Sequence, residues 1–134
     1  MSCAVVTHRI SQILEWDRRF PHPAYEFALD ALDEAVAVAR SADPNHGHIS
    51  GEDLLHTVKL VAFERFGPLA SFVLRQWGIP ESRLFWDVYR NLFSVGLVRF
   101  SEGDMSASFE GGFDVNTGFD DLQGKMMAEL GSIK

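Results

Sequence analysis

The stretch that decides the fold covers residues 50–100 and reads SGEDLLHTVKLVAFERFGPLASFVLRQWGIPESRLFWDVYRNLFSVGLVRF. Three amphipathic helical patterns follow one another in it, separated by very short turns. Gly67 and Pro68 separate the first from the second, because glycine ends helices and proline suits their first turn. Gly78 opens the second turn, and Gly96 ends the third helix. We therefore expect three consecutive helices, followed by a different structure after Gly96.

Each of these three helices has an apolar stripe that should face the core. The stripe of the first comprises Leu54, Leu55, Val58, Val61, Ala62 and Phe66; that of the second, Leu69, Phe72, Val73 and Trp77; and that of the third, Leu84, Phe85, Val88, Leu92 and Val95.

The period of the pattern changes after Gly96. Leu97 and Arg99 alternate with Val98 and Phe100, which is typical of a strand, and residues 105–109 suit a return strand. Helix, helix, tight turn, helix and hairpin is the order of a winged-helix domain. The sequence therefore predicts a mainly α fold with a small β-hairpin. Its winged-helix-like core would use the 81–95 helix for recognition and residues 97–109 as the wing.

One or two helices should precede this core. Residues 4–19 carry a partial apolar stripe, and residues 23–40 carry a clear one with Pro23 at the first turn. We expect a single domain over residues 1–134. Its parts are N-terminal helices in 1–47, the winged-helix-like core in 48–112, and an acidic tail in 113–134 that could hold a short helix.

Four segments resemble a family of uncharacterised conserved hypothetical proteins of planctomycetes and verrucomicrobia. They are AYEFALDALDEA at 24–35, HISGEDLL at 48–55, FGPLASFVLRQWGI at 66–79 and NLFSVGLV at 91–98. The resemblance covers most of residues 24–100 and fades in the tail. It implies a shared fold and transfers no catalytic residue, because that family has no assigned activity.

Composition places the chain among globular proteins. Its 134 residues are 46% hydrophobic and 23% charged, enough for one domain with its own core. No apolar run approaches the roughly 18 residues of a membrane span, and the start lacks a signal-peptide pattern. The single cysteine, Cys3, suits a reducing compartment, so we expect a cytoplasmic protein without a membrane partner.

The net charge of −7 is unevenly distributed. Residues 59–99 carry six basic and three acidic side chains, a net of +3, whereas residues 1–58 and 100–134 are each at −5. An acidic chain is repelled by phosphate as a whole, but its central segment is mildly basic.

The 81–95 helix and the residues after it carry the candidate interaction surface. Its members are Arg83, Trp86, Asp87, Arg90, Asn91, Ser94 and Arg99. Arginine and asparagine match base edges in a major groove, and an arginine on the wing could meet a phosphate. An ordinary solvated face explains the same charges. Trp86, Tyr89 and Phe93 form an aromatic stripe, which either docks a partner or is covered by the first two helices.

The leading hypothesis is a non-enzymatic module that binds another protein or a second copy of itself. The alternative is a nucleic-acid-binding regulator that uses the 81–95 helix and the 97–109 wing. The modest number of cations favours the first of these, since phosphate binders usually carry more.

Other polar groups suggest neither a cofactor nor a catalytic centre. His46, His48 and His56 are candidate metal ligands, although an ordinary loop with exposed histidines explains them better. The acidic positions of the 23–40 helix read as a solvated face, because no Glu-x-x-His partner accompanies them. A phosphate-binding glycine loop and a nucleophile elbow are missing from the sequence.

Overall fold

The computed structural model describes residues 3–42 and 51–98, which form five α-helices and two short 3₁₀ helices. The α-helices are α1 (Cys3–Trp16), α2 (His22–Ala42), α3 (Gly51–Phe66), α4 (Ala70–Gln76) and α5 (Phe85–Ser94), and the 3₁₀ helices are η1 (Gly67–Leu69) and η2 (Ser82–Leu84). The helices expected near residues 4–19, 23–40 and within 50–95 are confirmed, with shifted ends.

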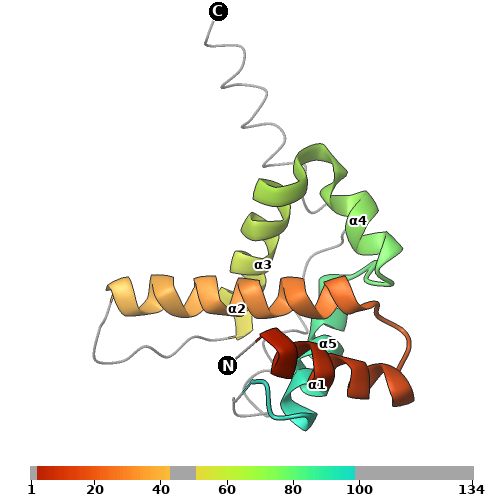
Figure 1. The fold of residues 1–134 in the computed structure, drawn as a ribbon. Coiled ribbons are helices and arrows are strands. Elements are labelled where there is room, and N and C mark those ends of the chain that lie inside the picture. Colours follow the sequence, from red (N-terminus) through yellow and green to blue (C-terminus); the bar gives the residue numbers. More distant parts are fainter. Residues whose placement is uncertain (1–2, 43–50, 99–134) are drawn as a thin grey trace, which may run out of the picture.

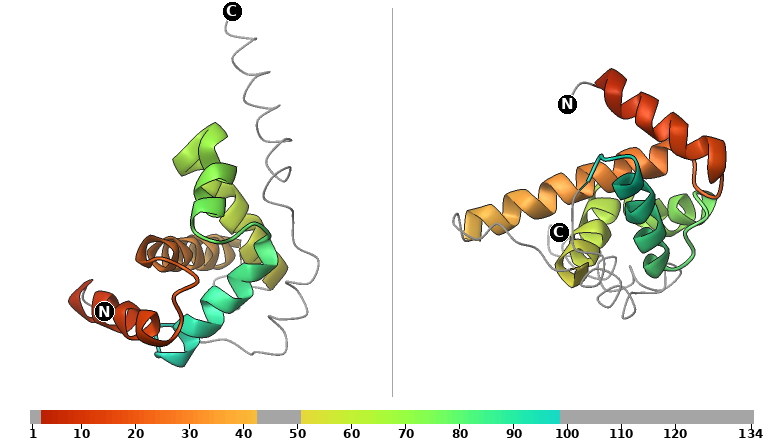
Figure 2. Two further views of the ribbon diagram at one scale, coloured as in Figure 1. Left: turned by 90° about the vertical axis from the view of Figure 1, so that its right-hand side faces the viewer. Right: turned by 90° about the horizontal axis from the view of Figure 1, so that it is seen from below.

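Helix α2 is the centre of the fold. It runs across the molecule, with α3 and α4 on one side and α1 and α5 on the other (Figure 1). Its buried positions recur at helical spacing and include four alanines, which let neighbouring helices approach closely. Seen along its axis, α2 has α1, α3 and α5 around it (Figure 2). One hydrophobic core contains residues from all five α-helices.

The winged-helix-like prediction is wrong. The described residues contain helices and no strand, and Leu97 and Val98 do not begin one. Helix α5 packs against both α2 and α1, so the proposed recognition helix is held between other elements. Most of the predicted wing, residues 97–109, and the acidic tail, 113–134, lie outside the described residues.

The physical reason for the error lies at Gly96. This residue has φ +78, its N–H donates to the Phe93 carbonyl at 3.0 Å, and the Leu97 N–H donates to the Leu92 carbonyl at 3.0 Å. These two bonds form a Schellman motif, which places an apolar residue directly after the glycine. The Gly-Leu-Val sequence is therefore a helix cap, and a cap of this kind precedes strands and irregular chain alike.

The predicted inward face of α4 is wrong at Leu69 and Phe72, although Trp77 does pack against the core. Leu69 and Phe72 are 63% and 53% exposed, whereas Ala70 and Leu74 are completely buried. In a helix of seven residues both stripes are apolar, so periodicity cannot choose between them. A second Schellman motif decides the matter, because the Ile79 N–H donates to the Leu74 carbonyl at 2.9 Å and both side chains are buried.

Helix α2, with 21 residues, is the longest described helix. None of the described helices combines the length and apolar character that crossing a membrane requires.

Candidate functional site

The predicted surface of α5 is not one exposed face. Asn91 is 5% exposed and Asp87 is partly buried, while Arg83, Arg90 and Ser94 are exposed. Of the two neighbouring side chains that could contact base edges, Arg90 is therefore exposed and Asn91 is buried.

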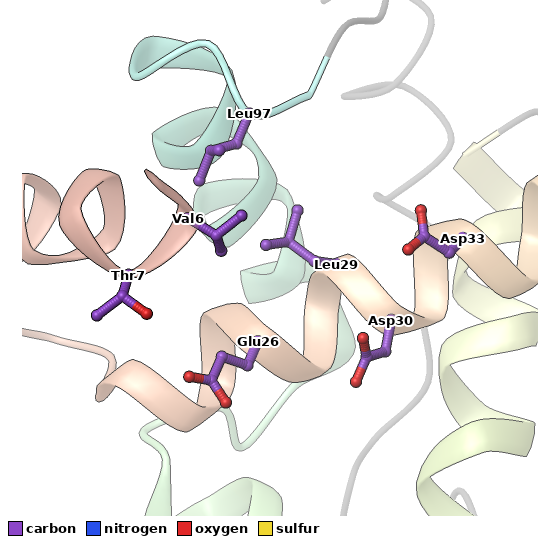
Figure 3. Close-up of a pocket in the computed structure, with 7 residues that line it drawn as sticks. All are labelled: Val6, Thr7, Glu26, Leu29, Asp30, Asp33 and Leu97. Atoms are coloured by element: carbon purple, nitrogen blue, oxygen red, sulfur yellow. The ribbon is translucent and has the colours of Figure 1, made fainter. Parts of the chain in front are cut away.

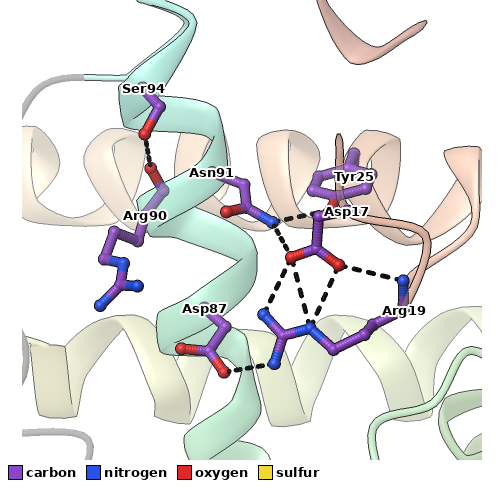
Figure 4. Close-up of polar contacts among 7 residues, drawn as sticks. All are labelled: Asp17, Arg19, Tyr25, Asp87, Arg90, Asn91 and Ser94. Carbon is purple, nitrogen blue, oxygen red and sulfur yellow. Dashed lines mark hydrogen bonds and ion pairs between the residues drawn. The ribbon is translucent and has the colours of Figure 1, made fainter. Parts of the chain in front are cut away.

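Asn91 and Asp87 belong to a polar cluster between α5 and the α1–α2 loop (Figure 4). The Asn91 amide donates to Asp17 Oδ2 at 3.0 Å and to the Tyr25 hydroxyl at 3.1 Å. Arg19 bridges two carboxylates, with its guanidinium 2.9 Å from Asp17 Oδ2 and 3.1 Å from Asp87 Oδ2. Each member of the cluster is satisfied by another, so the cluster holds α5 in place.

The electrostatics of this cluster fit a structural role. Hydrogen bonds from Arg19 lower the pKa of Asp17 from 3.8 to about 2, and a hydrogen bond from Asn91 adds to the effect. Pairing with Asp17 in turn raises the pKa of Arg19. Burial raises the pKa of the Tyr25 hydroxyl. All three groups keep their ordinary protonation state at neutral pH, as expected of a fixed ion-pair network.

The remaining predicted surface residues make local contacts. Arg83 Nε donates to Glu81 Oε2 at 2.6 Å, and the Ser94 hydroxyl donates to the Arg90 carbonyl at 3.0 Å. Figure 4 shows the Arg90 guanidinium pointing away from the cluster. Arg99 lies outside the described residues. A partner or nucleic-acid role for this surface stays a prediction.

The aromatic stripe of α5 divides between the core and the surface. Tyr89 is completely buried, and its hydroxyl donates to the Ala28 carbonyl in α2 at 2.7 Å. Burial raises the pKa of this hydroxyl, and the charge of Asp33 adds to the effect. Trp86 is partly buried against the core, and Phe93 is 39% exposed. Helix α2 therefore covers part of the stripe.

Of the candidate metal ligands, His56 is exposed on α3, and His46 and His48 lie outside the described residues. Within residues 3–42 and 51–98, no group of three or more histidine, cysteine and acidic side chains is arranged to hold a metal ion.

The candidate site is a groove between α1 and α2, which we call the α1–α2 groove (Figure 3). Its volume is about 530 Å³, within the range of ligand sites. Three apolar side chains form one wall and three carboxylates the other. The lining residues are Val6, Thr7, Glu26, Leu29, Asp30, Asp33 and Leu97.

Helical geometry explains the acidic wall. Glu26, Asp30 and Asp33 are spaced four and three residues apart, so they lie on one face of α2. Leu29 precedes Asp30 and is rotated by about 100° toward α5, which puts it beside Leu97 at the apolar wall. Helices α1 and α2 spread apart away from their connecting loop (Figure 2), and this divergence leaves the acidic face of α2 uncovered.

The three carboxylates differ in how they are paired. His22 Nδ1 lies 2.8 Å from Glu26 Oε1 within α2, and the Arg65 guanidinium of α3 lies 2.9 Å from Asp30 Oδ2. Within the described ranges, no basic side chain pairs with the exposed carboxylate of Asp33. Among residues 3–42 and 51–98, the groove thus carries a negative charge without a basic partner beside an apolar wall.

A smaller cavity of about 200 Å³ lies on the α3 side of α2. Asp30 lines both cavities, so the two are adjacent and the acidic surface continues from α2 onto α3. The residues that line the smaller cavity are Asp30, Glu34, Val61, Glu64 and Arg65.

Sequence reasoning found the acidic positions of α2 but interpreted them as a solvated face. The missing information was the position of α1, since the divergence of α1 from α2 is a property of tertiary packing. Leu29 itself packs against the core as the rest of the apolar face of α2 does, so the sequence pattern carried no signal for the groove.

The comparisons with known proteins found no match: no family model, no curated protein and no solved structure aligns with this chain. The resemblance to the planctomycete and verrucomicrobial family stays a prediction, and the α1–α2 groove is interpreted from the chain's own chemistry.

Proposed function

We propose that this protein is a non-enzymatic binding module that holds a basic segment of another protein in the α1–α2 groove. The observation that supports the proposal is the combination of three carboxylates with an apolar wall in one open cavity. The single Cys3 favours a reducing compartment, and we propose the cytoplasm as the place where this binding occurs.

The two walls of the groove select different parts of such a segment. A leucine-sized side chain against Val6, Leu29 and Leu97 gains about 1.5–3 kcal/mol on full burial, and less in an open groove. Lysine and arginine place their methylene stems on apolar surface while their charged ends reach carboxylates. The carboxylates also speed encounter with a cationic partner and repel acidic ones.

Charge argues against two other occupants. Residues 100–134 carry two lysines and seven acidic residues, a net of −5, so the chain's own tail is repelled by the groove. Nucleic acid is repelled for the same reason. A second copy of the chain could offer the basic side chains of residues 59–99. Sedimentation tests this alternative. Self-association of the wild type that is lost in Asp33→Lys would show that a second copy occupies the groove.

Three fluorescein-labelled 12-residue peptides test the proposal. The first alternates lysine and leucine, the second lysine and serine, and the third glutamate and leucine. We expect the lysine–leucine peptide to bind most tightly, because it satisfies both walls. Fluorescence anisotropy at about 50 mM and 300 mM salt should show weakening as salt screens the carboxylates.

Two charge reversals locate the binding. Asp33→Lys should weaken binding of the lysine–leucine peptide about tenfold, because it replaces attraction with repulsion at the groove. Glu15→Lys, on the exposed surface of α1 outside the groove, makes the same charge change and should have a small effect. Equal effects of the two variants, or equal binding of all three peptides, would contradict the proposal.

A further inference from the structure

The geometry points to Arg65 as an internal competitor for the α1–α2 groove: its guanidinium occupies Asp30 in the unbound protein, and a cationic side chain of the bound segment displaces it. This inference rests on the proposed function and deepens it, because it states how the occupancy of that groove is regulated.

The contact that must be broken is exposed. The Arg65 and Asp30 side chains are 43% and 52% exposed and meet at 2.9 Å. Arg65 comes from the last turn of α3, whereas Asp30 lies in the middle of α2, so the contact ties one carboxylate of the groove to a different helix. Exposed pairs of this kind are weak, so an incoming ammonium or guanidinium group can replace this one.

Other groups near Arg65 can hold its guanidinium after it leaves Asp30. Its guanidinium carbon lies 5.8 Å from the centre of the Phe27 ring, a contact that does not depend on Asp30. Arg65 also lines the smaller cavity together with Glu34 and Glu64. These two carboxylates are the alternative charge partners of the displaced guanidinium.

The release of Arg65 changes the groove through Asp30. It lines both cavities, so freeing its carboxylate joins the acidic wall of the groove to the acidic side chains of α3. Glu26 differs, because its partner His22 is on the same helix one turn earlier. Of the three carboxylates in the groove, Asp30 is thus the one whose availability depends on another helix.

Arg65→Gln tests the competition. Using the lysine–leucine peptide as the probe, we expect this variant to bind about two- to fivefold more tightly than the wild type, the range that matches an exposed ion pair. Arg40→Gln is the matched control: it removes the same charge from the exposed end of α2, where Arg40 lines neither cavity. Arg65→Lys keeps the charge and should stay near the wild-type affinity.

A double-mutant cycle separates competition from general electrostatics. In an Asp30→Asn background, Arg65→Gln should give no gain, because the carboxylate that Arg65 occupies is already neutral. An equal gain from Arg40→Gln, a gain that persists with Asp30→Asn, or weaker binding by Arg65→Gln would each overturn the inference. If Arg65→Gln leaves the affinity unchanged while Asp33→Lys still weakens it, this inference fails and the proposed function stands. No binding of the peptide to the wild type would overturn both.

Discussion

At the scale of single residues, two glycines with positive φ show what the fold demands of its turns. Gly78 has φ +79, and a Cβ at that position would lie 2.7 Å from the Arg19 carbonyl oxygen. Gly67 has φ +54, and a Cβ there would meet nothing within 4 Å. Gly78 therefore permits both a left-handed backbone and a close approach to the Arg19 backbone, whereas Gly67 permits only the left-handed backbone.

Alanine substitution should separate these two requirements. Gly67→Ala should lower the free energy of unfolding by about 1 kcal/mol, the cost of a left-handed conformation with a Cβ. Gly78→Ala should cost about 3 kcal/mol, because the α1–α2 loop must also move away from the α4–η2 turn. Urea unfolding followed by circular dichroism measures both values, and equal losses would show that the close approach at Arg19 is absent.

Asp17 gives the fold a dependence on acid. Its pKa in the folded protein, about 2, lies below the ordinary 3.8, so the folded state binds its proton less readily than the unfolded state. The resulting stabilisation is complete above pH 4 and is lost as the pH falls through about 2.

Asp17→Asn should therefore be less stable than the wild type at pH 7 by about 1 kcal/mol, after allowance for the solvent exposure of Arg19. The difference should narrow as the pH falls from 4 to 2. Glu15→Gln, on the exposed face of α1, removes the same charge and serves as the control in urea titrations at each pH. A constant difference between Asp17→Asn and wild type across this range would contradict the assignment.

At the scale of elements, one aromatic ring joins most of the helices. The Phe27 ring of α2 lies 6.0 Å from the Phe66 ring, 5.5 Å from the Trp77 ring and 6.1 Å from the Phe85 ring, measured between centroids. The ends of α3 and α4 and the start of α5 therefore meet at this side chain. The apolar pattern predicted the helices, but it did not single out Phe27 as their junction.

Two phenylalanines test the orientation of the elements. Phe27→Ala should lower the free energy of unfolding by about 4 kcal/mol, because it empties a packed site in the core. Phe72→Ala should cost under about 1 kcal/mol, because this ring is 53% exposed on α4. The periodicity of the sequence had placed Phe72 inside, so a large loss at Phe72 in urea unfolding would favour that orientation over the one described.

The correct and incorrect predictions have a common physical basis. Glycine and proline mark where α3, α4 and α5 end, because those residues act through local backbone geometry. The direction taken after a Schellman motif, the choice between two apolar stripes in α4 and the burial of Asn91 depend on distant contacts. Asn91, for instance, is buried by Asp17 and Tyr25, which lie 74 and 66 residues earlier in the chain.

At the scale of the whole molecule, the packing of α1 decides where a partner can bind. The α1–α2 loop is fixed to α5 by the cluster of Asp17, Arg19 and Asn91, and Arg9 Nη1 donates to the Val95 carbonyl at 2.6 Å. Helix α1 is thus held at α5 while it diverges from α2. The divergence leaves the acidic face of α2 beside the apolar wall, and this combination was not predictable from either helix alone.

The measurement that tests the proposed function most directly is chemical-shift mapping of the ¹⁵N-labelled protein with the lysine–leucine peptide. Binding in the α1–α2 groove predicts that the largest amide shifts lie at Thr7, Leu29 and Asp33, and that Asp33→Lys reduces them. Shifts concentrated at Arg83 and Arg90, on the interaction surface predicted from the sequence, or no shifts at millimolar peptide, would contradict binding in the groove.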